Sequence, residues 1–95
     1  MTIYLFDFDN TIVKLPYPET YDYMDTPESL DLSLGFKLIK RTNKGYQDAV
    51  QKNDGPIFLL SNRVSELKEP LKSILKTFGY KFDDYYLIDS DDRHK

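Results

Sequence analysis

The sequence predicts an α/β fold, in which a parallel sheet lies between helices as a three-layer α/β/α sandwich. Three short apolar runs, at residues 3–6, 57–60 and 85–88, have the length and composition of buried strands. Helical patterns lie between them, and strands that alternate with helices form parallel sheets through right-handed crossovers. The 95 residues suffice for one small domain, covering 1–95, and not for two.

Two carboxylates separated by one residue follow the first strand. Asp7 and Asp9 stand where the chain leaves the sheet, and ligands of open parallel sheets bind at that edge. This spacing suits covalent phosphoryl transfer, in which one carboxylate attacks phosphorus and the other transfers a proton. A hard cation such as Mg²⁺ prefers oxygen ligands and neutralises phosphate charge. The alternative is a polar strand end that forms a turn.

A flap or insertion is expected over roughly residues 12–42. Pro16 and Pro18 interrupt regular structure, so the chain leaves the sheet as a loop with several tyrosines. Thr26 and Pro27 are typical of a helix start, whereas the alternation that follows over residues 30–34 is typical of a strand. These two signals conflict, and both interpretations stay open.

Two helices are expected between the strands. Asn43 is the predicted N-cap of a helix that runs to about Lys52, and a strong turn signal at residues 53–56 ends it. The second helix is expected to begin near Glu69 with Pro70 in its first turn. Its apolar side chains recur at helical spacing, and Gly79 ends it. The residues of that apolar stripe are Leu71, Ile74, Leu75 and Phe78.

The second strand ends in Ser61, Asn62 and Arg63. A hydroxyl group and the following backbone N–H at a strand end can donate hydrogen bonds to phosphate oxygens. A guanidinium can add a bidentate contact. Taken alone, an apolar strand followed by serine indicates no more than a turn. Its position after the Asp7 strand makes it a candidate phosphate-binding segment.

The run from the first strand through Asp7-Phe8-Asp9-Asn10-Thr11 resembles the first motif of the haloacid dehalogenase (HAD) superfamily of phosphohydrolases. The resemblance implies a HAD-like Rossmannoid sheet and Mg²⁺-dependent chemistry. It implies that Asp7 is the nucleophile and Asp9 the general acid and base, and that both hold the metal, Asp9 through its backbone carbonyl. Asn10 and Thr11 are expected among the phosphate contacts.

The segment Leu59-Leu60-Ser61-Asn62-Arg63 resembles the second motif of the same superfamily. It implies phosphate binding by Ser61, Asn62 and Arg63. The resemblance is greatest to the capless, polynucleotide-phosphatase-like branch, and it covers essentially the whole chain but only the first part of that family's domain. We therefore expect a minimal or truncated version of the fold.

Two further superfamily motifs, a basic residue beside the nucleophile and a late acidic pair, lack clear counterparts. The chain after residue 87 has two interpretations: Asp91 and Asp92 are the acidic metal motif, or they only follow the third strand. Lys72, Arg93 and Lys95 are candidate substitutes for the missing cation. Without a fourth strand, the first strand leaves an apolar edge that invites pairing, so we expect a homo-oligomer through that edge.

Composition narrows the function. The 16 acidic and 13 basic side chains leave a net charge of -3, which argues against a nonspecific nucleic-acid binder but not against a nucleotide or a nucleic-acid end as substrate. The chain has no Cys, which favours a reducing, cytoplasmic location. It has no apolar stretch of about 20 residues and no visible signal peptide.

The sequence thus predicts a phosphatase that acts on a small phosphomonoester, a nucleotide or a nucleic-acid end. The alternative is a catalytically incomplete relative that binds phosphate, a metal or a partner protein, as a dimer.

Overall fold

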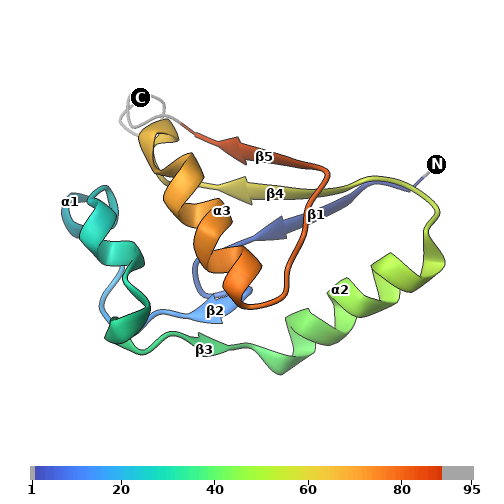
Figure 1. Cartoon of the computed structure of the whole chain (residues 1–95), viewed down its shortest axis with the longest axis horizontal. Coiled ribbons are helices and arrows are strands. Elements are labelled where there is room, and N and C mark those ends of the chain that lie inside the picture. Colours follow the sequence, from blue (N-terminus) through green and yellow to red (C-terminus); the bar gives the residue numbers. More distant parts are fainter. Residues whose placement is uncertain (1, 89–95) are drawn as a thin grey trace.

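The computed structural model describes residues 2–88, and its framework is a parallel sheet of three strands (Figure 1). These strands are β1 (Tyr4–Asp7), β4 (Ile57–Ser61) and β5 (Asp84–Leu87), in the order β1-β4-β5. All three lie where the apolar runs predicted strands. β4 is central, with Leu59 opposite Phe6 on one side and Tyr85 on the other. The predicted parallel α/β sheet is therefore confirmed.

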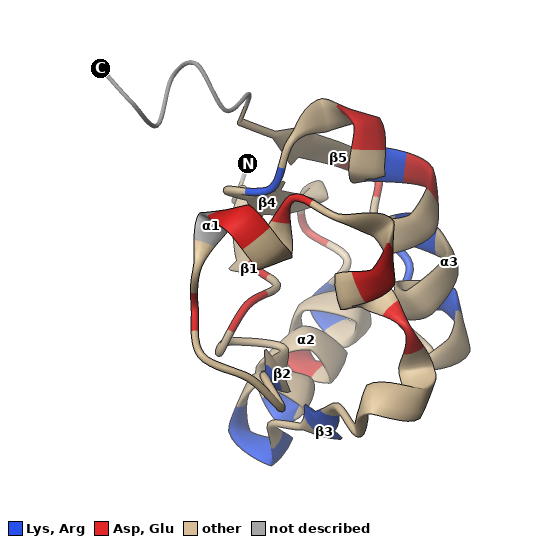
Figure 2. Cartoon of the chain, turned by 90° about the vertical axis from the view of Figure 1, so that its left-hand side faces the viewer, with Lys and Arg blue, Asp and Glu red and all other residues tan. Residues whose placement is uncertain are grey.

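Two helices, α2 (Lys40–Lys52) and α3 (Lys68–Thr77), pack on one face of this sheet (Figure 2). Phe6 of β1 meets Tyr46 of α2 edge to face, with ring centroids 6.0 Å apart. Alternate residues of β4 point toward the same face and are buried there, including Leu59. Each fully buried side chain of this size stabilises the fold by about 1.5–3 kcal/mol. The hydrophobic core therefore lies between the sheet and this single helical layer.

The predicted start of α2 is wrong. The helix begins at Lys40, with Ile39 at the N-cap, rather than after an Asn43 cap. Ile39 N–H donates to the carbonyl of Ile12 (2.9 Å), so tertiary pairing sets the position at which the helix starts. Asn43 instead donates from Nδ2 to the hydroxyl of Tyr80 (3.2 Å). The predicted end is confirmed, because Asn53 takes the left-handed conformation (φ 50°) after Lys52.

The second helix follows its predicted pattern closely. A 3₁₀ turn over Ser65–Leu67 leads into α3, and Pro70 lies in the first turn of the helix. Leu71, Ile74 and Leu75 are buried against the sheet, as their spacing indicated. No helix in the described part of the chain has both the length and the apolar character needed to cross a membrane.

The excursion after β1 is an extended loop closed by a small two-stranded antiparallel sheet. Val13–Lys14 (β2) pairs with Lys37–Leu38 (β3), and the chain between them, residues 15–36, is called the flap segment below. It contains the short helix α1 (Tyr21–Met24) and 3₁₀ turns over Pro27–Leu30 and Leu32–Leu34. The alternating leucines therefore form neither a strand nor a long helix.

The opposite face of the sheet carries apolar side chains, and no other part of residues 2–88 covers them fully. Ile3 and Leu5 are 60% and 61% exposed, and Leu60 and Tyr86 are 39% and 47% exposed. Parallel sheets are normally covered on both faces. Residues 2–88 form two of the three expected layers, and within them β1 pairs only with β4, so its outer edge is open.

Gly55 provides a test of how the chain enters β4. A Cβ atom added there would overlap the backbone carbonyl of Thr2, whereas one added at Gly45 in α2 would meet nothing within 4 Å. We expect Gly55→Ala to lower the free energy of unfolding by about 1–3 kcal/mol, because the two backbones must separate. Gly45→Ala should instead stabilise the protein by about 0.5–1 kcal/mol through helix propensity.

Urea denaturation followed by circular dichroism measures both changes. Equal stability of Gly55→Ala and the wild type would contradict the close approach of residues 2 and 55.

Candidate functional site

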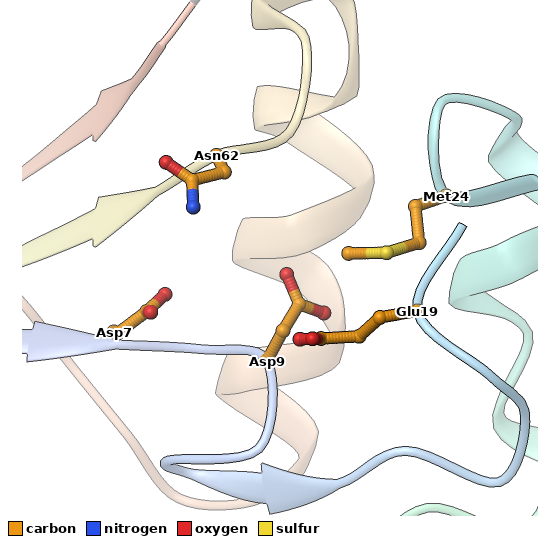
Figure 3. A pocket seen from close by; sticks show the side chains of 5 residues that line it. All are labelled: Asp7, Asp9, Glu19, Met24 and Asn62. Atoms are coloured by element: carbon orange, nitrogen blue, oxygen red, sulfur yellow. The ribbon is translucent and has the colours of Figure 1, made fainter. Parts of the chain in front are cut away.

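The carboxyl ends of β1 and β4 meet at a small cavity of about 220 Å³ (Figure 3). Asp7 is the last residue of β1, Asp9 follows two positions later, and Asn62 follows the end of β4. All three line the cavity, together with Glu19 and Met24 from the flap segment. The structure therefore brings three of the predicted site residues together, and it does so at the edge of the sheet where the sequence placed them.

The turn that presents Asp9 is built around Phe8. This residue is fully buried, and its carbonyl accepts hydrogen bonds from three successive backbone N–H groups, those of Thr11, Ile12 and Val13 (3.1–3.3 Å). Asn10 takes the left-handed conformation (φ 56°), and its Oδ1 accepts the N–H of Leu15 (3.1 Å). Asn10 and Thr11, predicted as phosphate contacts, shape this turn and do not line the cavity.

Asp7 lies at the mouth of the cavity with one oxygen engaged by the backbone. Its Oδ1 accepts the N–H of Phe8 (2.7 Å). Burial raises the pKa of Asp7 above its ordinary value, the Phe8 hydrogen bond opposes this shift, and the charge of Asp9 adds to it. The charge of Glu19 also raises this pKa, and the charge of Arg63 lowers it by a smaller amount than burial raises it.

Arg63 is fully buried, and all three nitrogen atoms of its guanidinium donate hydrogen bonds. Asp9 Oδ1 accepts from Nη2 (2.7 Å) and from Nε (3.2 Å), so the two residues form a buried ion pair. Nη2 also donates to the hydroxyl of Tyr17 (2.9 Å). Nη1 donates to the carbonyl of Met24 (2.8 Å) and to Ser29 Oγ (2.7 Å). These five contacts match the five N–H donors of a guanidinium.

This arrangement differs from the predicted role of Arg63 as a phosphate contact. Its guanidinium is directed toward Asp9 and the flap segment and does not line the cavity. Ser61 is also buried, and its Oγ accepts the N–H of Arg63 (3.2 Å). Neither side chain lines the cavity. A buried carboxylate needs a partner charge, and Arg63 supplies it to Asp9.

Lys72, the one other candidate cation within residues 2–88, does not line the cavity. Lys72 lies on α3, where it pairs with Glu69 (3.5 Å) and stands over the ring of Tyr85 (5.4 Å to the centroid). Arg93 and Lys95, and the acidic residues Asp91 and Asp92, lie outside residues 2–88.

Sequence reasoning missed the contribution of the flap segment. Glu19 and Met24 line the cavity, and Tyr17 and Ser29 hold Arg63. One signal was available: Glu19 is the only acidic residue of residues 15–20, a stretch that also holds two prolines and one tyrosine. Nothing in the local pattern indicated Ser29, because its role depends on a buried partner 34 positions later in the chain.

The cavity is strongly acidic. Its lining includes three carboxylates, an amide and a thioether, and no Lys or Arg from the described part of the chain. Burial also raises the pKa of Asp9, although the Arg63 guanidinium opposes this shift. Carboxylate and amide oxygens suit a hard divalent cation. Among residues 2–88, however, no three His, Cys, Asp or Glu side chains form a group that could hold a metal ion by themselves.

No protein-family model matches this chain, and no curated protein or solved structure is significantly similar to it. Fold and site therefore define the class: an α/β protein with a carboxylate-lined cavity at the carboxyl end of a parallel sheet.

The raised pKa of Asp7 predicts a stability effect with a definite sign. A carboxyl group whose folded-state pKa lies above its ordinary value of 3.8 destabilises the fold as pH rises through that interval. We expect Asp7→Asn, measured without divalent cations, to unfold at higher urea concentration than the wild type at pH 7. The difference should shrink as pH falls toward 4.

Asp48→Asn is the matched control, because Asp48 is exposed on α2 and its replacement should change stability by less than about 0.5 kcal/mol. An Asp7→Asn variant less stable than the wild type at pH 7 would contradict the destabilising burial of this carboxylate.

Proposed function

We propose that this chain is a HAD-like, Mg²⁺-dependent phosphohydrolase that forms an aspartyl-phosphate on Asp7. The observation that carries the proposal is the position of Asp7 and Asp9, which line one small cavity at the carboxyl end of the sheet, with Asn62 on the neighbouring strand end. The resemblance of residues 3–11 and 59–63 to the two superfamily motifs points the same way. In this view the described residues represent a minimal form of the family's three-layer sandwich.

The reaction would take place in two displacements. In the first, a carboxylate oxygen of Asp7 attacks phosphorus, the bond from phosphorus to the leaving oxygen breaks, and Asp9 donates its proton to that oxygen. In the second, Asp9 takes a proton from water, the water oxygen attacks phosphorus, and the bond to Asp7 breaks. Inorganic phosphate is released and Asp9 is again protonated. Burial, which raises the pKa of Asp9, works toward the acid form that the first displacement needs, whereas the ion pair with Arg63 works toward the carboxylate that the second displacement needs.

The donor set around the cavity fits Mg²⁺ in part. Asp7 through its carboxylate and Asp9 through its backbone carbonyl would hold the ion, and the side-chain oxygens of Asn62 and Glu19 in the same cavity lining are hard donors of the kind it prefers. When bound, the ion neutralises phosphate charge. Its charge would also lower the pKa of Asp7, which burial raises, and so favour the nucleophilic carboxylate.

The substrate would place one phosphoryl group in this cavity. A volume of about 220 Å³ is below the usual range for drug-sized ligands, so most of a nucleotide or a nucleic-acid end would lie outside it.

A second function is favoured by one observation: the cavity-lining residues found within 2–88 include no Lys or Arg. A chain without that cation could bind a divalent metal or phosphate without turnover. Such a binding module would bind Mg²⁺ in a calorimetric titration and release no product from any phosphomonoester.

Hydrolysis of p-nitrophenyl phosphate with Mg²⁺ tests the enzymatic proposal. We expect turnover by the wild type and none by Asp7→Asn, because the amide cannot attack phosphorus. Asp9→Ala should trap the aspartyl-phosphate, since p-nitrophenolate leaves without a proton but hydrolysis still needs a base. Mass spectrometry of the acid-quenched protein should detect this adduct in Asp9→Ala and not in Asp7→Asn.

Asp48→Asn should retain full activity, because it makes the same chemical change on the exposed side of α2. A folded wild-type chain that releases no p-nitrophenol above the buffer rate would contradict the enzymatic proposal and favour the binding module.

We also propose that the chain forms a homodimer through the open edge of β1. That edge has no partner within residues 2–88, and the neighbouring Ile3 and Leu5 are more than half exposed. A two-fold pairing would cover both and could bring a basic group of one protomer to the site of the other.

Leu5→Lys should convert a dimer to a monomer in light scattering, because it introduces a charge beside the paired edge. Leu32→Lys replaces a leucine that is 45% exposed on the flap segment and should leave the dimer intact. If the wild type at about 100 μM has the mass of one chain, the dissociation constant lies above that concentration. Such weak association would exclude this dimer.

A further inference from the structure

We infer that Arg63 is a positioning residue that holds Asp9 and the flap segment together as one unit over the cavity. The inference rests on the proposed role of Asp9 as general acid and base. It differs from the role that the motif resemblance implied, because Arg63 would act through Asp9 and not by contact with the phosphate.

The contacts of Arg63 fix the orientation of Asp9. Both of its hydrogen bonds to Asp9, from Nη2 and Nε, end on the same oxygen, Oδ1. Arg63 therefore leaves Oδ2 unengaged, and the carboxyl group lines the cavity beside Asp7 (Figure 3). Two adjacent N–H groups of one planar guanidinium converge on this oxygen and fix its position more firmly than a single ammonium would. A proton donor held in this way loses little conformational freedom when it acts.

The remaining contacts of Arg63 fix the flap segment. Its acceptors there, Tyr17 Oη, the Met24 carbonyl and Ser29 Oγ, span most of that segment. They also support one another, since Tyr17 Oη donates to the carbonyl of Ser29 (2.7 Å) and Ser29 Oγ donates to the carbonyl of Thr26 (2.6 Å). Met24 itself lines the cavity, so these bonds set the position of one cavity wall.

Burial makes the two sets of contacts interdependent. Arg63 and Ser29 are both fully buried, so acceptors lost on one side cannot be replaced by water without opening the segment. A displacement of the flap segment would leave Arg63 with only Asp9 as a partner, and loss of Asp9 would leave a buried cation held by neutral groups alone. The flap position and the orientation of Asp9 should therefore change together.

The first test compares two leaving groups. p-Nitrophenolate needs no proton as it leaves, whereas the alkoxide of glycerol 2-phosphate does, so a misplaced acid slows only the second reaction strongly. Arg63→Lys keeps the positive charge but loses the paired N–H donors of the guanidinium. We expect it to lower kcat/KM for glycerol 2-phosphate at least about tenfold more than for p-nitrophenyl phosphate. Tyr17→Phe and Ser29→Ala should show the same selective loss in smaller measure, although neither side chain lines the cavity.

Tyr23→Phe is the matched control for the flap variants. It removes a phenolic hydroxyl from the same segment, and its ring packs against Tyr17 (4.8 Å between centroids), but its hydroxyl is not an acceptor of Arg63. It should not change the ratio of the two kcat/KM values. Equal losses on both substrates in Arg63→Lys would overturn the inference, because a purely structural role lowers both alike.

The second test needs no activity. Hydrogen exchange reports the flap through the amides of Met24 and Ser29, which donate to Thr20 and Thr26, and global opening through the amide of Ala49 in α2. We expect Asp9→Ala and Arg63→Lys to speed exchange at Met24 and Ser29 at least about tenfold more than at Ala49. Equal acceleration at all three amides, or none at the flap, would overturn the inference.

The two tests separate the inference from the proposed function. A wild type that cleaves neither substrate contradicts the phosphohydrolase. In that case selective exchange at the flap still supports Arg63 as the link between Asp9 and the flap segment in a binding module.

Discussion

The buried charge of Arg63 is the constraint on which the site depends. A guanidinium without access to water must find an acceptor for each of its N–H groups, and here the acceptors come from the end of β1 and from three places in the flap segment. A loop of this length with little regular structure would otherwise have many positions of similar free energy. The hydrogen bonds of this one buried cation favour one of these positions, in which Met24 lies beside the two aspartates.

The two aspartates show how the same residue type is adapted to different tasks by its surroundings. Asp9 has a permanent cationic partner in Arg63, whereas Asp7 has a backbone N–H and a neighbouring carboxylate. Burial raises the pKa of both, so the site holds negative charge at a cost to the stability of the fold. Such a cost is typical of functional sites, and a cation bound in the cavity would reduce it.

The sheet imposes a second constraint, on the opposite side of the molecule. Both of its helices lie on one face, and the face that carries Leu5, Leu60 and Tyr86 keeps much of its apolar surface exposed within residues 2–88. β1 is an edge strand there although its residues are those of a central one. The position of Asp7 depends on β1, so whatever pairs with this edge would also stabilise the strand that carries the proposed nucleophile.

The sequence by itself determined the elements whose signals are local. Apolar runs located the three strands of the sheet, the spacing of Leu71, Ile74 and Leu75 located α3, and the order of elements implied that Asp7, Asp9 and Asn62 would meet at one edge of the sheet. The start of α2, the turns of the flap segment and the inward direction of Arg63 were decided by tertiary structure. Each of these depends on partners far away in the chain, such as Ile12 for Ile39 and Asp9 for Arg63. A motif indicates which chemical groups lie at a strand end. Whether a guanidinium there faces a ligand or a buried carboxylate depends on the packing of the flap segment, because burial and charge pairing are properties of the assembled fold.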